Sequence, residues 1–519
     1  MSTGTNIFQN LKEVDPLTIT FTVTPTDVSY VNALRRAILT EVETVGFRSD
    51  ILEDGSTTHV KVEKNNTPMT NEMLADRIGL VPIFMDPKKN PEHWTPEKPR
   101  YIFQLDKKSD KETSTDVYAS DFEIFENVEG EEKPLKLTSN KEFFRSDPAM
   151  MKLYPSLNLT PLIATLKGVQ ANQVPQEVSI VALATVGKGR DHVRFSPVSQ
   201  CSYKYTIDDN KDRQKAVFVN WLRTTKKVNL SDVKDEKEQV LLREFNTMEV
   251  ERCFLKDERD EPYSFDFTIE TRGQLDSRTV VTRGLEAMIE KFKKYSTMNV
   301  GDLPDNITIE PADWTGIGYD LLIQNEDHTL GDPLQTWMDT NIVVDENGKN
   351  GKISFAGKKI PHPLRDEMVF RIGFPANADK EKVNELAVRT IFADAARACA
   401  SIFTEWLRMW TDIVAGKKGV APPPATKVKR AYKVSTGLEN VVAAMKENES
   451  WGDTMMEENK KAGVNKANSP EGTPGVPMAK AAPVPPPEVV AGVPKGISGD
   501  QPAPKQDKRR GTFWKKDPL

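Results

Sequence analysis

The densest cluster of titratable side chains in the sequence is Glu326, Asp327 and His328, and a second histidine, His362, lies in the polar segment KKIPHPL. A hydrolytic or metal-dependent site needs ligands at fixed offsets, such as two histidines four residues apart on a helix with a third ligand and a positioned base. Neither segment has this spacing, and the chain has no serine elbow, phosphate-binding loop or paired-aspartate motif. We therefore expect no catalysis by this chain alone, and we expect Glu326 and Asp327 to cap the helix that follows them.

Cysteine spacing, net charge and the length of apolar runs exclude several classes of protein. Cys201, Cys253 and Cys399 lie far apart without a CxxC pair, which predicts buried, reduced thiols of an intracellular protein and no metal or cofactor site. The formal net charge of -6 argues against broad phosphate binding. The first residues lack a secretory or myristoylation signal, and no apolar run approaches the ~20 residues that cross a bilayer. We therefore expect a soluble protein without membrane contact.

A strand followed by a capped helix is predicted near both ends of the globular part. Residues 17–23 (LTITFTV) alternate with the period of a strand, and Asp27 is placed to cap a helix through VSYVNALRRAILTEV. YDLLIQNEDHTLGDPLQ repeats this order of strand, acidic residue and helix. A shift of 300 positions aligns Asp27 with Asp327, Ser29 with Thr329, Asn32 with Asp332 and Leu34 with Leu334. The match favours an internal duplication, although chance is the alternative for a single match of this kind.

Two long helices are predicted to join these units. The first covers 277–295, and the second runs from Asp379 to about Ala415. The second helix carries an apolar stripe with members three or four residues apart, and its alanine-rich middle permits close approach of another helix. We expect the two helices to cross along a seam formed by Ile391, Ala395, Ala398, Ile402 and Trp406.

Changes in composition divide the chain into parts. Residues 1–48 and 193–296 are predicted to form a first, discontinuous domain around an inserted β-rich domain at 49–192. Residues 297–318 contain turn-forming residues and are predicted to connect it to a second domain at 319–415. Residues 416–519 are proline-rich and predicted to be mostly disordered, with a segment at 436–458 that could form a helix when docked. The expected fold class is α+β.

Several segments resemble one protein family, in the order in which that family carries them. NALRRAILTEVETVGF, MLADRIGLVPI, VRFSPVSQCSYKY and PYSFDFTIETRGQL resemble the bacterial RNA polymerase α subunit, its larger archaeal counterpart and the third-largest subunit of RNA polymerase II, over roughly residues 15–296. LLIQNEDHTLGDPLQ, FAGKKIPHPL and the long helix resemble the smaller archaeal counterpart and the eleventh subunit of RNA polymerase II, over about residues 319–414. Their fusion resembles the arrangement in polymerases of nucleocytoplasmic large DNA viruses.

The resemblance implies two α-like dimerisation modules that pair within one chain and nucleate assembly of a DNA-directed RNA polymerase. The implied partners are the second-largest subunit, the largest subunit and small zinc-binding subunits, with DNA bound only through the complex. The implied location is the virion and the cytoplasm of the infected cell, with the nucleus as the alternative. By position, the resemblance assigns partner-binding roles to Asn32, Arg35, Arg36, Arg77, Gly79, Glu326, Asp327, His328, Thr329, Leu330 and Gly331.

Arg35 and Arg36 carry the most direct of these assignments. They lie beside the apolar stripe of their helix, so at least one guanidinium is expected to face outward, where its donors suit docking of the second-largest subunit. The alternative is a local ion pair with Glu41 or Glu43.

Two features depart from the family pattern. Many larger partners carry a metal-binding cysteine cluster in the inserted domain, but residues 49–192 contain no cysteine, so no metal is carried over. Asp332 and Pro333 replace the usual pair after Gly331, and because proline does not suit a helix interior, a shifted helix start is expected.

A second hypothesis is a standalone nucleic-acid-binding or virion structural protein that uses KRRGTFWKK at 508–516 as its contact. Basic residues interleaved with Phe513 and Trp514 could stack on bases and neutralise phosphates. A short basic tail is more often solvated or docked on a partner.

Overall fold

The computed structural model describes residues 5–50, 58–95, 97–110, 112–128, 133–145, 160–169, 173–228, 235–344, 351–378, 383–417, 419 and 422. The predictions for 436–458 and 508–516 lie outside the described residues.

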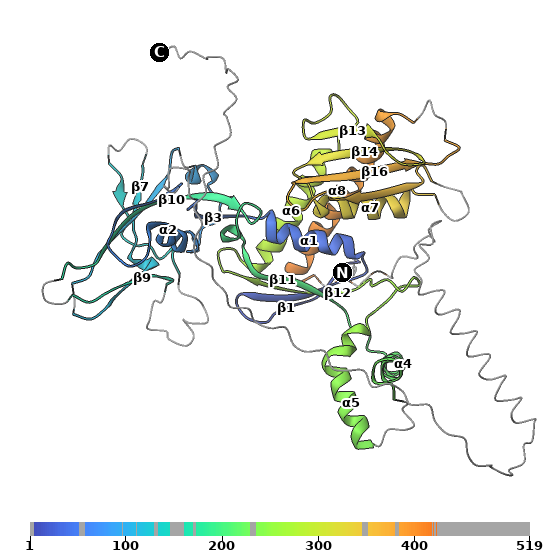
Figure 1. Cartoon of the computed structure of the whole chain (residues 1–519), viewed down its shortest axis with the longest axis horizontal. Helices are drawn as coiled ribbons and strands as arrows, with labels where there is room; N and C mark the ends of the chain where they lie inside the picture. The colour runs from blue at the N-terminus through green and yellow to red at the C-terminus, as the bar shows by residue number, and fades with distance from the viewer. Residues whose placement is uncertain are drawn as a thin grey trace, which may run out of the picture. The chain divides into compact units, whose positions relative to one another are not determined.

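Two four-stranded antiparallel sheets have the same topology (Figure 1). The first half contains β1 (Phe8–Glu13), β2 (Thr18–Val23), α1 (Val28–Thr40), β11 (Val198–Tyr205), β12 (Phe265–Thr271) and α6 (Ser277–Tyr295). The second half contains β13 (Ile307–Pro311), β14 (Ile317–Gln324), α7 (His328–Asn341), β15 (Phe355–Lys359), β16 (Glu367–Phe374) and α8 (Glu385–Val414). The strand orders are β1-β2-β12-β11 and β13-β14-β16-β15, so each sheet places its first, second, fourth and third strands side by side. One helix follows the second strand and another follows the fourth in both halves, as expected of an internal duplication.

The shorter helices α1 and α7 begin at equivalent aspartates. The Asp27 carboxylate accepts a hydrogen bond from the Ser29 amide at 3.0 Å, and the Asp327 carboxylate accepts one from the Thr329 amide at 2.7 Å. These contacts confirm the predicted caps at Asp27 and Asp327. Glu326, which was also expected to cap α7, instead contacts Lys291 and Tyr295. The expected shift of the second helix start is wrong, because α7 begins at His328 and contains Pro333 in its interior. The cap fixes the first turn, and the proline is accommodated one turn later.

The two long helices α6 and α8 also begin at side-chain caps. Asp276 caps α6, which begins and ends at the predicted residues. Asn384 caps α8 by accepting a hydrogen bond from the Ala387 amide at 2.9 Å, so this helix begins at Glu385 and not at Asp379. Residues 379–382 lie outside the described part of the chain.

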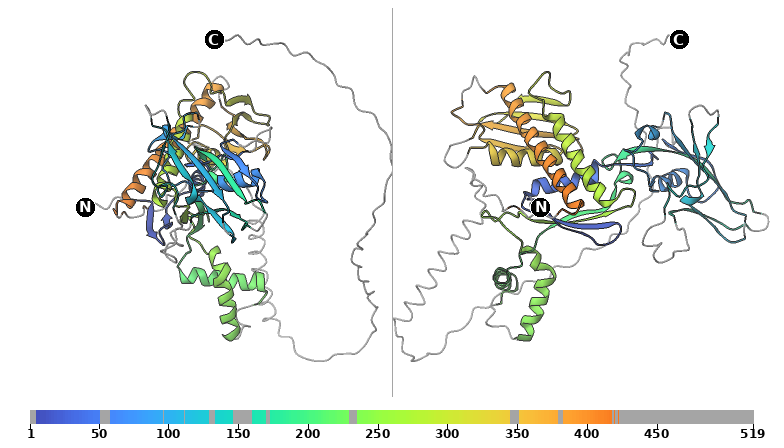
Figure 2. Two further views of the ribbon diagram at one scale, coloured as in Figure 1. Left: turned by 90° about the vertical axis from the view of Figure 1, so that its left-hand side faces the viewer. Right: turned by 180° about the vertical axis from the view of Figure 1, so that it is seen from behind.

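One hydrophobic core is shared by both halves. Figure 2 shows α6 and α8 side by side, and side chains from both sheets pack against the helices. The rings of Phe292 and Phe403 stack with centroids 5.7 Å apart across the α6–α8 contact. Phe8 of β1 reaches the rings of Trp406 and Trp410 at 5.9 and 5.3 Å. The first sheet and the last helix therefore bury each other's apolar surface.

The buried face of α8 differs from the predicted seam by a small rotation. Ile391, Ala395 and Trp406 are buried, but Ala398 and Ile402 are only partly buried. The fully or nearly fully buried stripe is instead formed by Phe392, Ala396, Cys399, Phe403, Trp406 and Trp410. The large rings at 392, 403 and 410 determine which face of α8 is buried. The prediction counted alanines and large apolar residues equally, so it placed the stripe slightly to one side.

The inserted domain contains a six-stranded and a two-stranded sheet. Its strands are β3 (Glu43–Phe47), β4 (Val60–Asn65), β5 (Tyr101–Lys108), β6 (Thr115–Tyr118), β7 (Glu123–Glu126), β8 (Leu135–Lys136), β9 (Leu162–Leu166) and β10 (Glu177–Lys188). Its helices are α2 (Asn71–Gly79) and the short η1 (Pro91–Trp94), η2 (Ala119–Asp121) and η3 (Val193–Phe195). Because β3 pairs with β10, this sheet begins before the predicted boundary at residue 48.

Two further segments differ from the sequence predictions. β13 lies within 297–318, which were predicted to be a connector, and it pairs with β14 along its whole length. The segment RFSPVSQCSYKYTI at 194–207 predicts a strand pair around Pro197, but the structure has the short η3 followed by β11. A helical excursion between β11 and β12 contains α4 (Lys211–Trp221), the π-helical turn η4 (Leu222–Lys226), α5 (Asp235–Met248) and η6 (Glu249–Arg252). None of the described helices combines the length and apolarity needed to cross a membrane.

The shared core predicts a large difference between two neighbouring alanines of α8. Replacing Ala396, which is fully buried, by glutamate places an unpaired charge in the core and should lower the free energy of unfolding by about 3 kcal/mol or more. Ala398→Glu is the matched control, because its side chain can reach solvent. Urea unfolding of both variants measures the difference, and equal losses would show that the buried face has been misassigned.

Candidate functional site

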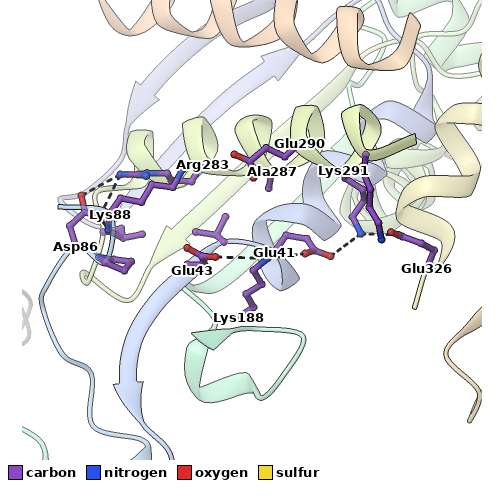
Figure 3. A pocket seen from close by; sticks show the side chains of 14 residues that line it. Glu41, Glu43, Asp86, Lys88, Lys188, Arg283, Ala287, Glu290, Lys291 and Glu326 are labelled. Carbon is purple, nitrogen blue, oxygen red and sulfur yellow. Dashed lines mark hydrogen bonds and ion pairs between the residues drawn. The ribbon is translucent and has the colours of Figure 1, made fainter. Parts of the chain in front are cut away.

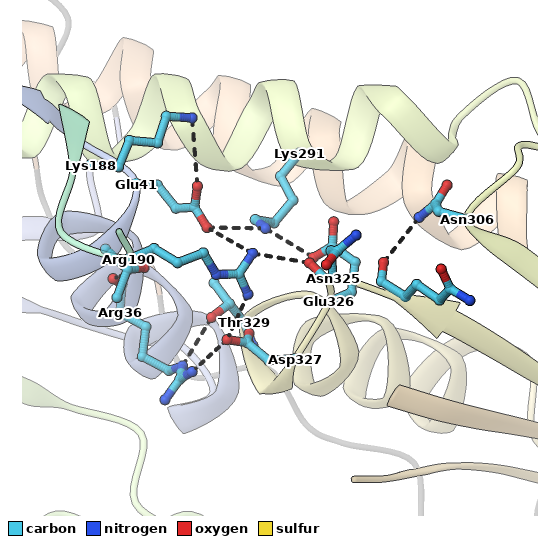
Figure 4. A network of polar contacts seen from close by, with 12 residues as sticks. Arg36, Glu41, Lys188, Arg190, Lys291, Asn306, Asn325, Glu326, Asp327 and Thr329 are labelled. Atoms are coloured by element: carbon cyan, nitrogen blue, oxygen red, sulfur yellow. Dashed lines mark hydrogen bonds and ion pairs between the residues drawn. The ribbon is translucent and has the colours of Figure 1, made fainter. Parts of the chain in front are cut away.

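A buried lysine joins the two halves. The side chain of Lys291 on α6 is 8% exposed, and its Nζ lies 2.9 Å from Glu326 Oε2 and 3.2 Å from Glu41 Oε1. Figure 4 shows Lys291 between Glu41 and Glu326, which belongs to the second half. Glu326 also accepts a hydrogen bond from the Tyr295 hydroxyl at 2.9 Å. Burial acts to lower the pKa of Lys291, but the carboxylates of Glu326 and Glu41 outweigh it and raise the pKa. The lysine therefore stays charged and holds two carboxylates from different halves together.

Two arginines converge on Asp327 beside this lysine. Arg36 Nη2 lies 2.8 Å from Asp327 Oδ2, and Arg190 Nη2 lies 3.2 Å from the same oxygen. Burial acts to raise the pKa of Asp327, but hydrogen bonds from Thr329 and the charges of Arg36 and Arg190 lower it to about 2. Arg190 also donates to the carbonyl oxygen of Asn325 at 3.0 Å. The cap of α7 is thus held by the first half of the chain.

The contacts between α1 and α7 are reciprocal. The Ser29 hydroxyl of α1 hydrogen-bonds the Thr336 hydroxyl of α7 at 2.7 Å, and Arg36 Nε of α1 donates to the Thr329 hydroxyl of α7 at 2.9 Å. Under the shift of 300 positions, Ser29 corresponds to Thr329 and Arg36 corresponds to Thr336. An interface in which position i meets j and j meets i is the pattern of two-fold pairing between related units.

Arg36 makes its polar contacts with the second half of the chain. It was predicted to dock a partner or to pair with Glu41 or Glu43, but it is bonded to Asp327 and Thr329 of the second half. Arg77 is also occupied within the chain, because its guanidinium donates to the carbonyl oxygens of Ile163 and Leu162 at 2.7 and 3.0 Å. Both side chains therefore have partners within the chain, and their contacts with other subunits stay predictions.

Side chains pack closely against the motif glycines. A Cβ on Gly331 would lie 2.6 Å from Met368 Sδ, and a Cβ on Gly79 would lie 2.7 Å from Ser49 Oγ. Leu330 and Thr329 are buried, whereas His328 is 46% exposed and contacts Lys358. The motif after β14 therefore mostly packs within the chain.

Arg35 and Asn32 lie on an open groove. Arg35 Nε donates to Asn32 Oδ1 at 3.1 Å on α1. The groove has a volume of about 480 Å³ and runs between α1 and the edge strand β11. Its other lining residues are Cys201, Ser202, Tyr203, Lys204, Tyr205 and Glu251. Within the described part of the chain, no element of the second half lines this groove.

A charged cleft of about 250 Å³ lies beside Lys291 (Figure 3). Lys88 pairs with Glu286 of α6 at 2.7 Å, and Arg283 of α6 pairs with Asp86 at 3.4 Å. These ion pairs tie the inserted domain to the first half. The charged side chains that line the cleft largely pair with one another. These ion pairs stabilise the packing of the inserted domain against α6.

Sequence reasoning missed Lys291 and Arg190. Lys291 could have been found, because it lies three residues after Met288 and four before Tyr295 on the buried face of α6. A lysine on such a stripe indicates a buried ion pair. Arg190 lies in the loop after β10, and its sequence gives no signal of its contact with Asp327.

The structure offers no metal site among the residues that it describes. No three His, Cys, Asp or Glu side chains gather in a way that could hold an ion. Cys201, Cys253 and Cys399 are buried free thiols, and burial raises the pKa of Cys201 to about 12.

The chain is similar to subunits of DNA-directed RNA polymerases. Residues 20–292, just over half of the chain, match the family described as the RNA polymerase Rpb3/Rpb11 dimerisation domain. The chain is 25% identical over 289 residues to the DNA-directed RNA polymerase subunit Rpo3 of Methanosphaera stadtmanae, covering 54% of this chain and 94% of the relative. It is 24% identical over 294 residues to the DNA-directed RNA polymerases I and III subunit rpac1 of Dictyostelium discoideum, covering 51% and 74%.

The buried lysine predicts an asymmetric response to substitution. Lys291→Met leaves the buried Glu326 carboxylate without its ion-pair partner and leaves Glu41 with only the longer contacts to Lys188 and Arg190, at 3.8 and 4.0 Å. The substitution should cost about 3 kcal/mol of unfolding free energy. Adding Glu326→Gln removes one of these charges and should recover part of the loss. Urea unfolding at pH 7 tests this, and a double variant no more stable than Lys291→Met would contradict the ion-pair account.

Asp327 predicts a pH-dependent contribution to stability. Because its folded pKa of about 2 lies below the ordinary aspartate value of 3.8, its contribution is present above pH 3.8 and is lost as pH falls through 2. Asp327→Asn, which can still cap a helix, should cost about 2 kcal/mol at pH 7. The cost should shrink below about pH 4, as measured by urea unfolding across pH. A cost independent of pH would mean that charge is not its source.

Proposed function

Because this chain belongs to the RNA polymerase Rpb3/Rpb11 dimerisation domain family, we propose that it is a non-catalytic assembly subunit of a multisubunit DNA-directed RNA polymerase in which two α-like modules are fused. The relatives that it matches are themselves named as RNA polymerase subunits. In this role the chain performs no reaction, and it provides a rigid platform on which the large subunits assemble.

The reciprocal contact between α1 and α7 is the observation that carries the proposal of two fused modules. Ser29 meets Thr336 while Arg36 meets Thr329, at positions related by the same offset. The identical strand orders and the shared core of α6 and α8 support the same interpretation. The first module comprises β1, β2, α1, β11, β12 and α6. The second module comprises the elements from β13 to α8.

The groove beside Arg35 is the proposed docking site for the second-largest subunit. It lies on the face of α1 that the second half leaves uncovered, and a guanidinium with a fork of donors suits a carboxylate of a partner. The largest subunit and small zinc-binding subunits are proposed as further partners, and DNA contact is proposed to occur only through the complex.

The fusion of two modules also supports a proposal about the kind of organism from which this protein comes. Two partners on one polypeptide resemble the arrangement in nucleocytoplasmic large DNA viruses, so we propose a role in viral transcription. The proposed location is the virion and the cytoplasm of the infected cell, with the nucleus as the alternative. Detection of the chain in purified virions would support it.

The neighbouring arginines should respond differently to charge reversal. Arg35→Glu should leave the fold intact and weaken capture of the second-largest subunit roughly 30-fold, because a central interfacial arginine contributes ~2 kcal/mol or more. Arg36→Glu should destabilise the chain itself, because it opposes Asp327. A pull-down with the second-largest subunit from the same source, paired with thermal unfolding, measures both effects.

Lys293→Glu is the control for this experiment, because Lys293 is an exposed residue of α6. Undiminished capture by folded Arg35→Glu would remove the groove from the docking surface.

A further inference from the structure

Among the strands that the structure describes, β15 lies at the edge of the second sheet and has a neighbour on one side. It pairs with β16, and no other described strand pairs with Phe355–Lys359. Val343 pairs with Ile353 just before β15, but within the described residues this pairing does not continue along the strand. An open edge presents unpaired backbone donors and acceptors, which proteins either blunt with charge or use to bind another strand.

A cavity of about 350 Å³ follows this edge and has an aromatic floor. The rings of Trp314 and Phe355 lie with centroids 5.4 Å apart, and the Arg371 guanidinium lies 5.8 Å from the Trp314 centroid. Phe355 is 39% exposed, and the buried Trp314 Nε1 has no hydrogen-bond partner within the described part of the chain. An exposed ring beside an unpartnered indole N–H indicates an incomplete site.

Glycines make this floor flat. A Cβ on Gly357 would lie 2.5 Å from the Phe355 ring, and a Cβ on Gly373 would lie 2.8 Å from the Trp314 ring. Both rings therefore rest on backbone where a side chain would displace them. A floor already formed before binding reduces the entropy that a ligand must lose.

Charge at the groove favours an acidic ligand at one end. Arg371 is bound by Asp320 through two contacts of 2.6 and 2.7 Å, and Lys358 pairs with Asp332 at 2.7 Å. Lys359 ends β15, is exposed and has no ion-pair partner within the described residues. It is therefore the cation of the groove that remains for a partner's carboxylate. Asp320 beside the aromatic floor disfavours the phosphates of a nucleic acid.

The groove is the counterpart of the Arg35 groove in the first half. Each lies between the edge strand of its sheet and the helix that follows the second strand, and Gln335 of α7 stands where the offset of 300 places Arg35. The first groove is lined by charged and tyrosyl side chains, and the second by Trp314 and Phe355. The two grooves therefore suit different ligands.

We infer that the groove along β15 binds an extended segment of a partner protein, which adds a strand to the second sheet. Phe355 and Lys359 are four residues apart on one face of β15. Side chains on one face of a strand recur every second residue, so the partner segment carries a large apolar residue and an acidic residue four positions apart. The apolar residue packs on Trp314 and Phe355, and the acidic residue meets Lys359. This inference does not depend on which complex the chain assembles.

A random twelve-residue peptide library displayed on phage, selected on the immobilised full chain, tests the inference. Enriched peptides should share an apolar and an acidic residue four positions apart. Synthetic fluorescent copies should bind Lys359→Glu and Phe355→Ala at least about tenfold more weakly, as measured by anisotropy. Replacing the acidic residue of the peptide by lysine should restore binding to Lys359→Glu.

Lys12→Glu is the matched control, because Lys12 is an exposed lysine on β1, an edge strand of the other sheet. Its peptide affinity should equal that of the unaltered chain. Thermal unfolding shows whether each variant is folded. If Phe355→Ala is unfolded, the peptide affinity of Lys359→Glu alone tests the inference. The inference is overturned if no peptide is enriched or if binding is indifferent to Lys359→Glu. It is also overturned if this edge instead pairs with a second copy of the chain in sedimentation, or binds a single-stranded oligouridine through Phe355.

Discussion

Each half of this chain has a long helix whose apolar face is covered in part by the other half. The long helix α8 exposes a stripe of rings and small residues over its whole length, and α6 together with β1 covers it. Burial of such a stripe is the largest favourable contribution available to the chain. The remaining features follow from this pairing. It brings α1 against α7, and among the described strands it leaves β11 and β15 at the edges of their sheets.

Charged contacts favour pairing of the two different halves over pairing of a half with its own copy. On one side of the reciprocal contact Arg36 meets the capping Asp327, and on the other two hydroxyls meet. A second half paired with its own copy would place Thr336 where Arg36 now stands, leaving Asp327 without that cation. Lys291 adds a second requirement, because its cation lies between Glu41 of the first half and Glu326 of the second, and Glu326 would lose this ion-pair partner in any other pairing. The apolar core stabilises the pair, and the ions distinguish one half from the other.

The sequence was most informative where local physics decides the structure. The caps Asp27 and Asp327 and both limits of α6 follow from side chains that act on their own backbone, so they could be predicted. The strand β13 could not, because its proline and the glycine after it favour turns and only pairing with β14 makes it a strand. The contact of Arg36 with Asp327 could not be predicted either, because the sequence shows that an arginine leaves the core of its own helix, but not which distant aspartate it meets.

Native mass spectrometry of the complex purified from the natural source through a tag on this chain tests the central claim most directly. The account predicts one copy of this chain with the two large polymerase subunits and no separate α-like partner. Two copies of the chain, a separate smaller partner in the same complex, or the absence of large polymerase subunits would contradict it.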